Sequence, residues 1–364
     1  MQQELYIGLM SGTSLDGVDA ALTSFNGNHC QIIHKHFSAY SATLRTDLLA
    51  LHSSGENELE RSMLLGNQLA QLYAATVNEL LENAEVDPGS VHAIGCHGQT
   101  IRHRPELGFT LQIGNAALLA ELTNITVVAD FRSRDIAAGG QGAPLVPAFH
   151  AAVFSDNKVH RVILNIGGIA NLTDLPTDGI VKGFDSGPGN LLINAWIEQH
   201  MGKAYDESGN WAMTGQVIAP LLETLLAHPY FAQMPPKSTG RDMFNLPWLT
   251  QYLTPDHAPA DVQRTLLELT AQSIVMAIKQ YCATAAEVYL CGGGAHNRLL
   301  VQRLQQLLHP VKIGLTDDLG IGTDWLEAAA FAWLAKQTLD YAPGNLPAVT
   351  GAEGPRILGA VYAR

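Results

Sequence analysis

The stretch LYIGLMSGTSLDGVDAALTSF, residues 5–25, decides the fold. It places apolar runs at Leu5–Leu9 and Val18–Phe25 on either side of a turn rich in glycine and small hydroxyl residues. This pattern predicts two antiparallel strands joined by a hairpin. A third run, Gln31–Phe37, follows a polar turn. The chain is therefore expected to open on a three-stranded antiparallel meander.

The segment VILNIGGIANLTDL, residues 162–175, repeats this pattern. A strand at Val162–Ile166 is followed by a turn at Gly167 and Gly168 and a return strand at Asn171–Leu175. After each hairpin, strand and helix patterns alternate. The predicted strands are Val91–Cys96, Thr126–Asp130, Glu287–Leu290 and Val311–Leu315. The predicted helices are Glu58–Asn83, Asn115–Leu122, Leu145–Val153, Leu191–His200, Val217–Ala227, Val262–Tyr281, Asn297–Leu308 and Trp325–Leu339. We therefore expect an α/β protein of two duplicated lobes around a central cleft that binds the ligand.

Composition excludes several classes of protein. Of 364 residues, 47% are hydrophobic and 15% charged, which is typical of a globular chain with a large core. The 21 basic against 34 acidic residues give a net charge of −13, which disfavours nucleic acid as a partner. Because no apolar run reaches the ~18 residues of a spanning helix, and the four cysteines show no CxxC spacing, we expect a soluble cytoplasmic protein with no membrane partner.

Two segments do not fit the alternation of strands and helices. Gln233–Pro247 and Asp135–Pro147 are too polar, or too interrupted by glycine and proline, for core elements. Loops of this length are usually functional or disordered. We expect both segments to be long loops.

The first hairpin turn has the composition of a phosphate cradle. Glycines and small hydroxyl residues leave backbone N–H groups unobstructed, and such a concavity binds phosphate oxygens. The candidate residues are Ser11, Gly12, Thr13, Ser14 and Gly17. Two nearby carboxylates, those of Asp16 and Asp19, are candidates to hold Mg²⁺ through water, with Asp16 as the candidate metal ligand. A plain hairpin turn explains the composition about equally well.

Two further glycine clusters follow in the second half. Gly167 and Gly168 form a second candidate phosphate turn within NIGGIANLT. In CGGGAHN, residues 291–297, three glycines at a strand end would let a flat ring or ribose lie against the backbone. The candidate nucleotide contacts are Gly292, Gly293, Gly294 and Asn297. Ordinary turns are the alternative for both clusters.

Two carboxylates lie where a base could be positioned. Asp185 lies in GFDSGPGN, residues 183–190, which we interpret as a turn before a helix. It is either a helix cap or a positioned general base. Glu327 falls in the first turn of the last predicted helix, where an ordinary acidic residue also favours the helix dipole.

Polar residues after two predicted strands are candidate ligand contacts. CHGQTIRH, residues 96–103, places His97 and Gln99 directly after a buried strand, and such positions line clefts in α/β sheets. Arg132 and Arg134 could bind a ligand carboxylate, or else pair with neighbouring Asp130 or Asp135. A zinc site is disfavoured, because His97 has no partner histidine at helical spacing.

Together these motifs resemble the phosphate-1, phosphate-2 and adenosine motifs of the sugar kinase, Hsp70 and actin superfamily. More closely, the chain resembles the anhydro-N-acetylmuramic acid kinases. The matching segments are MSGTSLDGVD, CHGQTIRH, ADFRSRDIAAGGQGAP, NIGGIANLT, GFDSGPGN and CGGGAHN, and they extend over essentially the whole chain.

The resemblance implies two actin-like ATPase lobes of the ribonuclease H-like type that bind ATP and Mg²⁺. We expect the first lobe at residues 1–140 plus 341–364 and the second at 141–340. It also implies a cytoplasmic homodimer that recycles peptidoglycan sugar. In the implied reaction, water opens the 1,6-anhydro ring of 1,6-anhydro-N-acetylmuramic acid while ATP phosphorylates O6, giving N-acetylmuramate 6-phosphate and ADP.

On this resemblance Asp185 is the general base that activates water, and Glu327 is a second carboxylate near the substrate. The residues implied to hold the sugar and its lactyl carboxylate are His97, Gln99, Arg132, Arg134 and Asn171.

Three other functions stay open on the sequence alone. A simple hexose or amino-sugar kinase would use Asp185 to deprotonate a hydroxyl group instead of water. A non-enzymatic ATP-driven conformational module would need a further interaction surface. A metalloprotein of the same superfamily uses an HxxxH pair and is disfavoured, because His92 and His97 are five residues apart.

Overall fold

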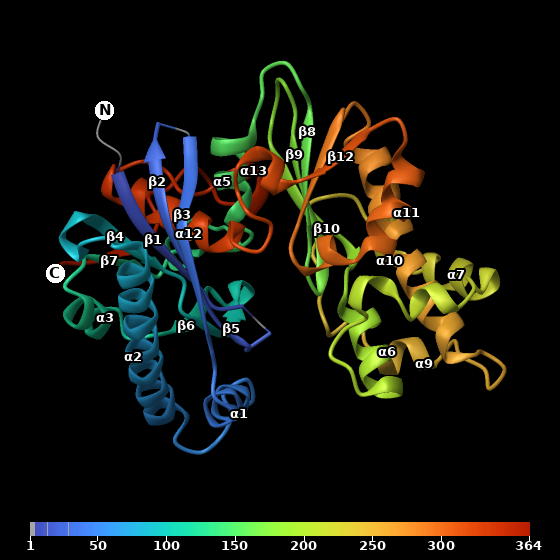
Figure 1. The fold of residues 1–364 in the computed structure, drawn as a ribbon, viewed down its shortest axis with the longest axis horizontal. Coiled ribbons are helices and arrows are strands. Elements are labelled where there is room, and N and C mark those ends of the chain that lie inside the picture. The colour runs from blue at the N-terminus through green and yellow to red at the C-terminus, as the bar shows by residue number, and fades with distance from the viewer. Residues whose placement is uncertain (1–3, 13, 28) are drawn as a thin grey trace. The chain divides into compact units, whose positions relative to one another are not determined.

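The computed structural model describes residues 4–12, 14–27 and 29–364. It divides the chain into two compact units, Met1–Val153 with Gly320–Arg364 and Phe154–Leu319. Each unit has its own sheet (Figure 1). The boundaries differ from the expected ones, because residues 141–153 and 320–340 belong to the first unit. The reason is helix α12 (Leu326–Leu339), which packs on the sheet of the first unit.

The sheet of the first unit has six strands in the order β13-β7-β4-β1-β2-β3. Their bounds are β1 (Glu4–Met10), β2 (Gly17–Asn26), β3 (His29–Ala39), β4 (Val91–Cys96), β7 (Val127–Ala129) and β13 (Ala360–Tyr362). Strands β1, β2 and β3 form the predicted antiparallel meander, while β4 runs parallel to β1 and to β7. A separate hairpin, β5 (Gln99–Arg104) and β6 (Phe109–Ile113), follows β4. The meander prediction is confirmed.

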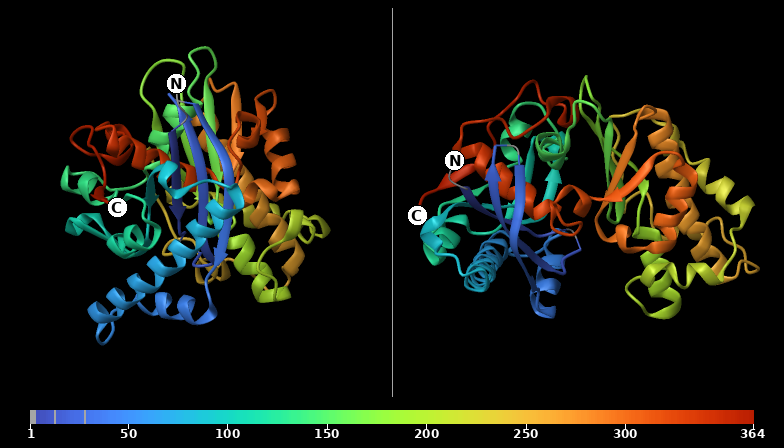
Figure 2. Two further views of the ribbon diagram at one scale, coloured as in Figure 1. Left: turned by 60° about the vertical axis from the view of Figure 1, so that its left-hand side comes forward. Right: turned by 45° about the horizontal axis from the view of Figure 1, so that its top comes forward.

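The helices of the first unit cover both faces of this sheet (Figure 2). They are α1 (Ala42–Ala50), α2 (Glu58–Ala84), α3 (Ala116–Thr123), α4 (Ser133–Ala137), α5 (Val146–Phe154), α12 and α13 (Pro347–Thr350). Ile7 and Leu9 of β1 share a buried cluster with Leu69 and Tyr73 of α2. The alternate residue Gly8 faces α12, where a Cβ would lie 1.7 Å from the carbonyl oxygen of Ala328. This glycine lets the helix approach the strand closely.

The sheet of the second unit has five strands in the order β10-β9-β8-β11-β12. Their bounds are β8 (Arg161–Ile166), β9 (Ile169–Leu175), β10 (Lys182–Pro188), β11 (Glu287–Cys291) and β12 (Lys312–Leu315). Strands β8, β9 and β10 form an antiparallel meander, and β11 and β12 run parallel to β8. When the strands of each main sheet are numbered in chain order, β3-β2-β1-β4-β7 of the first sheet and β10-β9-β8-β11-β12 of the second both have the order 3-2-1-4-5. This shared order confirms a duplicated α/β fold of the ribonuclease H-like type.

Helices of the second unit bury their apolar faces in a second core. They are α6 (Leu191–Met201), α7 (Ala219–Leu226), α8 (Pro229–Ala232), α9 (Leu246–Thr250), α10 (Pro259–Tyr281) and α11 (Arg298–Leu308). Short 3₁₀ turns occur at Pro88–Ser90, Pro105–Leu107, Glu207–Gly209, Ala212–Thr214, Gly293–His296 and Thr316–Leu319.

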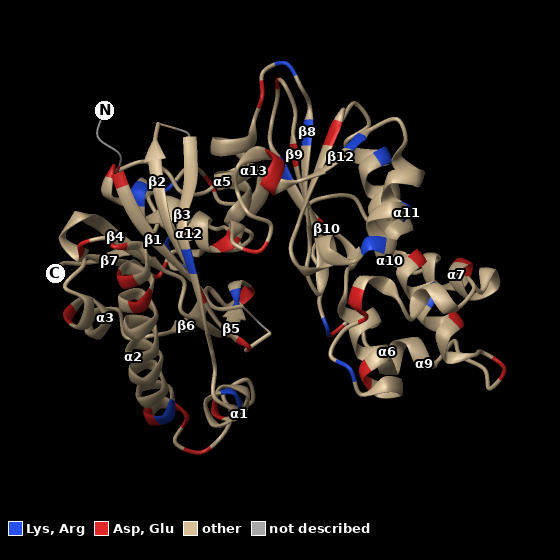
Figure 3. Ribbon diagram, in the orientation of Figure 1, with Lys and Arg blue, Asp and Glu red and all other residues tan. Residues whose placement is uncertain are grey.

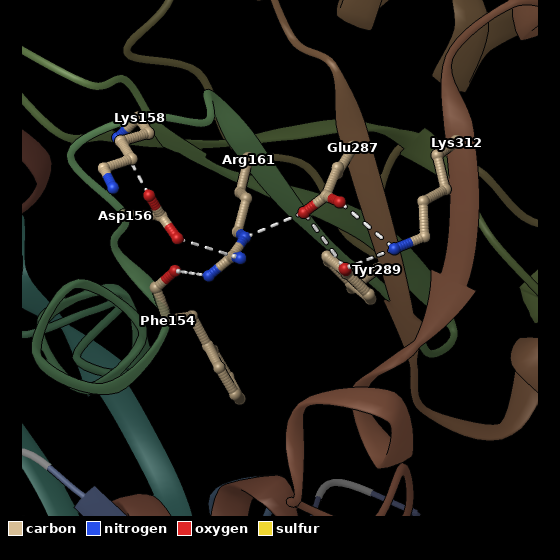
Figure 4. A network of polar contacts seen from close by, with 7 residues as sticks. All are labelled: Phe154, Asp156, Lys158, Arg161, Glu287, Tyr289 and Lys312. Carbon is tan, nitrogen blue, oxygen red and sulfur yellow. Dashed lines mark hydrogen bonds and ion pairs between the residues drawn. The ribbon is translucent and has the colours of Figure 1, made fainter.

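A polar network ties together the first residues of the parallel strands β8, β11 and β12 (Figure 4). Arg161 of β8 pairs with Glu287 of β11 at 2.9 Å and with Asp156 at 3.1 Å. Lys312 of β12 reaches the same Glu287 at 3.1 Å. Since the glycine motifs follow the opposite ends of β8 and β11, this network stabilises the edge of the sheet away from them.

Charge and hydropathy agree with this architecture. Acidic and basic residues are interspersed along both units (Figure 3). Within the part of the chain that the structure describes, no helix has the length and apolar character needed to span a membrane.

Two sequence interpretations were wrong about local structure. GFDSGPGN is mainly strand β10 and not a turn. This strand lies at the edge of its sheet, where Pro188 at its last position is tolerated. The segment Asp135–Pro147 also includes most of helix α4 and the beginning of α5.

Candidate active-site residues in two units

Asp185 is held on strand β10 of the second unit, directly opposite Asn171 of β9. A bulge follows, because Gly187 pairs with Ala170 and Ser186 is left over. The Oδ2 atom of Asp185 accepts a hydrogen bond from the backbone N–H of Thr239 at 3.0 Å. Within the described residues, no donor contacts Oδ1. One carboxylate oxygen is therefore anchored, and the other remains available as a proton acceptor.

The environment of Asp185 tunes its basicity. Burial raises the pKa of this carboxyl group to about 6, although the Thr239 N–H and the charge of Lys237 lower it. A carboxylate of this kind is ionised at neutral pH and is more basic than an exposed aspartate. This is the property expected of a general base.

The second hairpin turn is anchored through its carbonyl groups. The N–H groups of Gly189 and Leu191 donate to the carbonyl oxygen of Gly168 at 2.9 and 3.0 Å, and that of Asn190 donates to Gly167 at 2.8 Å. A Cβ on Gly168 would meet nothing closer than 4.0 Å. Internal packing therefore does not require this glycine, and the turn keeps an open surface for a ligand.

The three glycines of CGGGAHN have different roles. A Cβ on Gly292 would lie 2.3 Å from Asn165 Oδ1, and one on Gly294 would lie 2.2 Å from the Ile166 side chain. Packing therefore accounts for these two. The nearest atom to a Cβ on Gly293 would be 3.9 Å away, and Gly293 lines a cavity. Of these three glycines, Gly293 is the one whose lack of a side chain internal packing does not require.

The cavity beside Gly293 has a volume of about 450 Å³. Its other lining residues are Asn190, Asn194, Tyr205, Asp206, Glu207, Ser208, His296 and Asn297. The Asn297 Oδ1 atom caps helix α11 by accepting from the N–H of Leu300 at 3.2 Å. A cavity of this size is within the range of small-ligand sites.

The first hairpin, in the first unit, rests on a buried network of hydroxyl groups. Ser11 Oγ shares hydrogen bonds of 2.8 Å with Tyr73 and with Tyr40. Gln99 is fully buried, and its Nε2 donates to the carbonyl oxygen of Gly12 at 3.2 Å. Ser11 and Gln99, predicted to touch ligand, thus have internal partners and support the turn. Thr13 lies outside the described residues.

Carboxylates gather beside this first hairpin. Burial, together with repulsion from Asp16, Glu327 and Asp324, raises the pKa of Asp19 to about 7. Ser14 Oγ donates to Oδ1 of the exposed Asp16 at 2.7 Å. This concentration of negative charge favours a bound cation.

In the first hairpin, internal packing requires a glycine at position 17 but not at position 12. A Cβ on Gly17 would lie 2.3 Å from the carbonyl oxygen of Ser38, so Gly17 serves the packing of β2 on β3. Among the residues that the structure describes, a Cβ on Gly12 would contact only Ser14, at 3.5 Å or more. The open surface of this turn is therefore at Gly12.

The buried His97 and the partly buried Arg132 form a pair in the first unit. Nη2 of Arg132 donates to Nε2 of His97 at 2.9 Å, and Nη1 donates to the carbonyl oxygen of Gly142 at 2.8 Å. Burial, together with the Arg132 charge, lowers the pKa of His97 to about 3, so the imidazole is neutral and accepts this bond.

Glu327, in the first turn of α12, is electrostatically coupled to this pair. Burial raises the pKa of Glu327, and Arg132 opposes the rise. Burial also lowers the pKa of Arg132 to about 10, although Glu327 and Asp135 act against it. Arg132 is therefore a partly buried cation at neutral pH, suited to an anionic ligand group.

Arg134 is not part of the pair formed by His97 and Arg132. It lines a different cavity, of about 630 Å³, together with Arg356 and residues at the end of α12. Among the described residues it makes no contact with His97 or Gln99. The structure therefore does not group Arg134 with the other predicted substrate residues.

The alternative ion pairs of Arg132 and Arg134 do not form within the described residues either. Asp130 accepts from Ser133 Oγ at 2.5 Å. Asp135 is fully buried and accepts from Asn345, Thr350 and the N–H of Gly142.

The donor groups present fit Mg²⁺ better than a tightly chelated metal. Within the described residues, no cluster of three or more His, Cys, Asp or Glu side chains is arranged to hold a metal ion. Asp16 and Asp19 remain close to an open turn. Mg²⁺ is commonly held in this way, by one or two carboxylates plus water and substrate phosphates.

Sequence reasoning missed three residues around Asp185. Tyr230 of helix α8 donates to the carbonyl oxygen of Asp185, and Lys237 and Thr239 contact Asp185 or act on it from the polar segment that was expected to be a long loop. The length of that segment was the available signal, since long loops in compact domains are often functional.

Comparisons with known proteins identify the family of this chain. Residues 4–364 match the family described as anhydro-N-acetylmuramic acid kinase. A protein of that name from Nitrosomonas europaea is 58% identical over 98% of this chain and 99% of its own length. One from Nitrosospira multiformis is 57% identical over the whole of both chains, and one from Thiobacillus denitrificans is 56% identical over 99% of this chain and 98% of its own. The chain belongs to the anhydro-N-acetylmuramic acid kinase family.

Proposed function

We propose that this chain is an ATP-dependent kinase that opens the 1,6-anhydro ring of 1,6-anhydro-N-acetylmuramic acid with water and phosphorylates O6. The products are N-acetylmuramate 6-phosphate and ADP. Family membership supports the substrate class. The observation that carries the mechanism is Asp185, which has one anchored oxygen and one open oxygen and lies in the meander that contains the glycine turn.

The reaction balances with a single base. Asp185 accepts a proton from water while the water oxygen bonds to C1 of the sugar. The C1–O6 bond breaks, and O6 takes the γ-phosphoryl group, so that ADP leaves and the proton on Asp185 passes to solvent. Because phosphoryl transfer captures charge as it develops on O6, no separate acid is needed for the leaving oxygen.

Each unit supplies residues for the substrates in this proposal. The open turns at Gly12 and at Gly167 and Gly168 bind phosphate oxygens, and the cavity beside Gly293 takes the adenosine. Asp16 and Asp19 would hold Mg²⁺, which neutralises phosphate charge when bound. Support comes from the space above these glycines and from the repulsion among the carboxylates.

His97, Arg132, Asn171 and Glu327 are the proposed sugar contacts. Arg132 is suited to the lactyl carboxylate, because it is a partly buried cation that makes no ion pair within the described residues. Recognition of that carboxylate would discriminate against neutral sugars.

The biological setting follows from the family resemblance. We propose that the protein acts as a homodimer in the cytoplasm and recycles peptidoglycan sugar. Light scattering of the purified protein tests the oligomeric state, with a mass of twice 39.1 kDa expected.

A panel of sugars tests the proposed activity. ADP release is expected with the anhydro sugar and not with ordinary hexoses or amino sugars. Equal turnover of an ordinary amino sugar would favour the simple kinase instead.

The variant Asp185→Asn tests the role of the base. It is expected to lower kcat by about 10²- to 10⁴-fold while ATP affinity stays within a few fold. Retained turnover would refute Asp185 as the base.

A further inference from the structure

The polar segment after helix α8 is hydrogen-bonded to strand β10, which carries Asp185. The backbone N–H of Asp185 donates to the carbonyl oxygen of Lys237 at 3.1 Å, and the N–H of Thr239 donates to Asp185 Oδ2 at 3.0 Å. Tyr230 Oη donates to the carbonyl oxygen of Asp185 at 2.7 Å. Main chain and side chain of Asp185 are thus both fixed at the bulge of β10.

The ammonium group of Lys237 is held beside this strand by other partners. Its Nζ lies 3.3 Å from the carbonyl oxygen of Tyr230, 3.4 Å from that of Phe231 and 4.7 Å from the centre of the Tyr230 ring. These carbonyls are at the C-terminal end of α8, which favours a cation. Among the described residues, Lys237 and Asp185 form no direct ion pair, although the charge of each acts on the other.

Other groups near Asp185 contribute little charge. Strand β9 places the neutral amide of Asn171 opposite it, and helix α10 presents Ser273 next to Gly187. The pKa of Tyr230 is raised by burial, so its hydroxyl group is neutral. On β10 itself Lys182 is exposed and lies opposite Asp174.

We propose that Lys237 is a positioning residue that keeps Asp185 ionised at neutral pH while leaving its second oxygen free to take a proton from water. This rests on the proposed role of Asp185 as the base. A cation bonded directly to Oδ1 would occupy the atom that must accept the proton. The α8 carbonyls prevent this because they hold the ammonium group at a distance where its field still acts on the carboxylate.

The test is the pH dependence of kcat/KM in the variant Lys237→Met. Loss of the positive charge makes Asp185 easier to protonate, so the acidic limb of the profile is expected to move upward by about one pH unit. Activity relative to the unmodified protein then falls by about fivefold near pH 6 and by much less near pH 8.5. Lys237→Arg is expected to restore most of the original profile.

Tyr230→Phe is the matched control. It keeps the ring beneath Lys237 and removes the hydroxyl group that bonds the Asp185 backbone. We expect kcat to fall similarly at every pH, with the acidic limb unmoved. A Lys237→Met profile of this same shape would overturn the proposal, as would an unchanged profile.

Further measurements distinguish a folding defect of the variant, a wrong role for Lys237 and a wrong role for Asp185. If Lys237→Met does not fold, Lys237→Gln takes its place. A carbon-13 titration of the Asp185 carboxyl group in the folded protein reads its ionisation without turnover, and an unshifted midpoint in the variant contradicts the role of Lys237. Asp185→Asn is assayed alongside, because retained turnover there overturns the proposed function and not the electrostatic effect.

Discussion

The two hairpin turns occupy equivalent positions in sheets of the same strand order, yet they are built differently. The first turn rests on the buried hydroxyl groups of Ser11, Tyr40 and Tyr73, and carboxylates lie around it. The second turn contains two glycines, and backbone N–H groups anchor its carbonyl oxygens. A duplicated fold has thus kept its topology while the two turns use different chemical groups.

This difference suggests a division of labour. An open turn beside Asp16 and Asp19 suits a phosphate that arrives with its cation, because repulsion among the carboxylates is relieved by positive charge. A neutral turn of backbone groups suits phosphate oxygens without a cation. The predictions below test whether each turn depends on its own kind of support.

The largest effect is expected at the second turn from Gly189→Ala. Its new Cβ would lie 2.4 Å from the carbonyl oxygen of Gly167, so the turn must move. Overpacking of this kind costs about 1–3 kcal/mol of unfolding free energy, and ATP affinity should fall as well. Urea denaturation and ATP titration measure both quantities.

Gly168→Ala is the control for the same turn. The nearest described atom to the new Cβ would be Leu191 Cβ, at 4.0 Å. The free energy of unfolding should therefore change by less than about 0.5 kcal/mol. ATP affinity should nevertheless fall, since the methyl group occupies the open surface. Unchanged ATP affinity in Gly168→Ala would contradict phosphate binding at this turn.

At the first turn, Asp19→Asn should change the pH dependence of stability. The pKa of Asp19 is about 7 in the folded protein, above its ordinary value of 3.8. The folded state therefore binds more protons between these values, and this contribution to stability is present at low pH and lost as pH rises toward 7. The free energy of unfolding of the variant, relative to that of the unmodified protein, should therefore increase by about 1 kcal/mol or more from pH 4.5 to pH 8.

Urea denaturation at the two pH values checks this difference. Asp16→Asn removes one of the charges that repel the Asp19 carboxylate, so it should lower the pKa of Asp19 and reduce this pH dependence without abolishing it. An equal stability difference for Asp19→Asn at both pH values would show that Asp19 is not the strained carboxylate.

The smallest effect is expected from Tyr73→Phe. Loss of this hydroxyl group removes one of the hydrogen bonds to Ser11 and should cost about 1 kcal/mol of unfolding free energy. It should also weaken ATP binding by a few fold through the first turn. Tyr281→Phe, which removes an exposed hydroxyl group bonded to Gln233, is the control and should change neither quantity appreciably. Unaltered ATP binding in Tyr73→Phe would mean that the first turn does not need this network.

The sequence predicted the elements whose patterns are local. Both meanders opened with alternating apolar residues and glycine turns, and the structure has them. Strand β10 escaped prediction because Gly183, Gly187 and Pro188 are turn residues in most contexts. An edge position and a bulge accommodate them here.

The sequence predicted which residue types belong to the candidate site better than it predicted where their side chains point. Arg132 and Arg134 are two residues apart and therefore point to different sides, so that one reaches His97 and the other a separate cavity. Gln99 looked like a ligand contact, but its amide is used inside the fold. Lys237 acts on Asp185 through a segment more than 50 residues away, and no local pattern encodes such a contact.

Labelled water tests the central claim most directly. In H₂¹⁸O, single turnovers quenched before the sugar ring can exchange its anomeric oxygen should give N-acetylmuramate 6-phosphate with ¹⁸O at C1 and none in the transferred phosphate. We expect this label in the unmodified protein. In Asp185→Asn we expect the labelled product to be lost together with turnover. An unlabelled C1, or ¹⁸O in the phosphoryl group, would contradict the claim that water activated by Asp185 opens the ring.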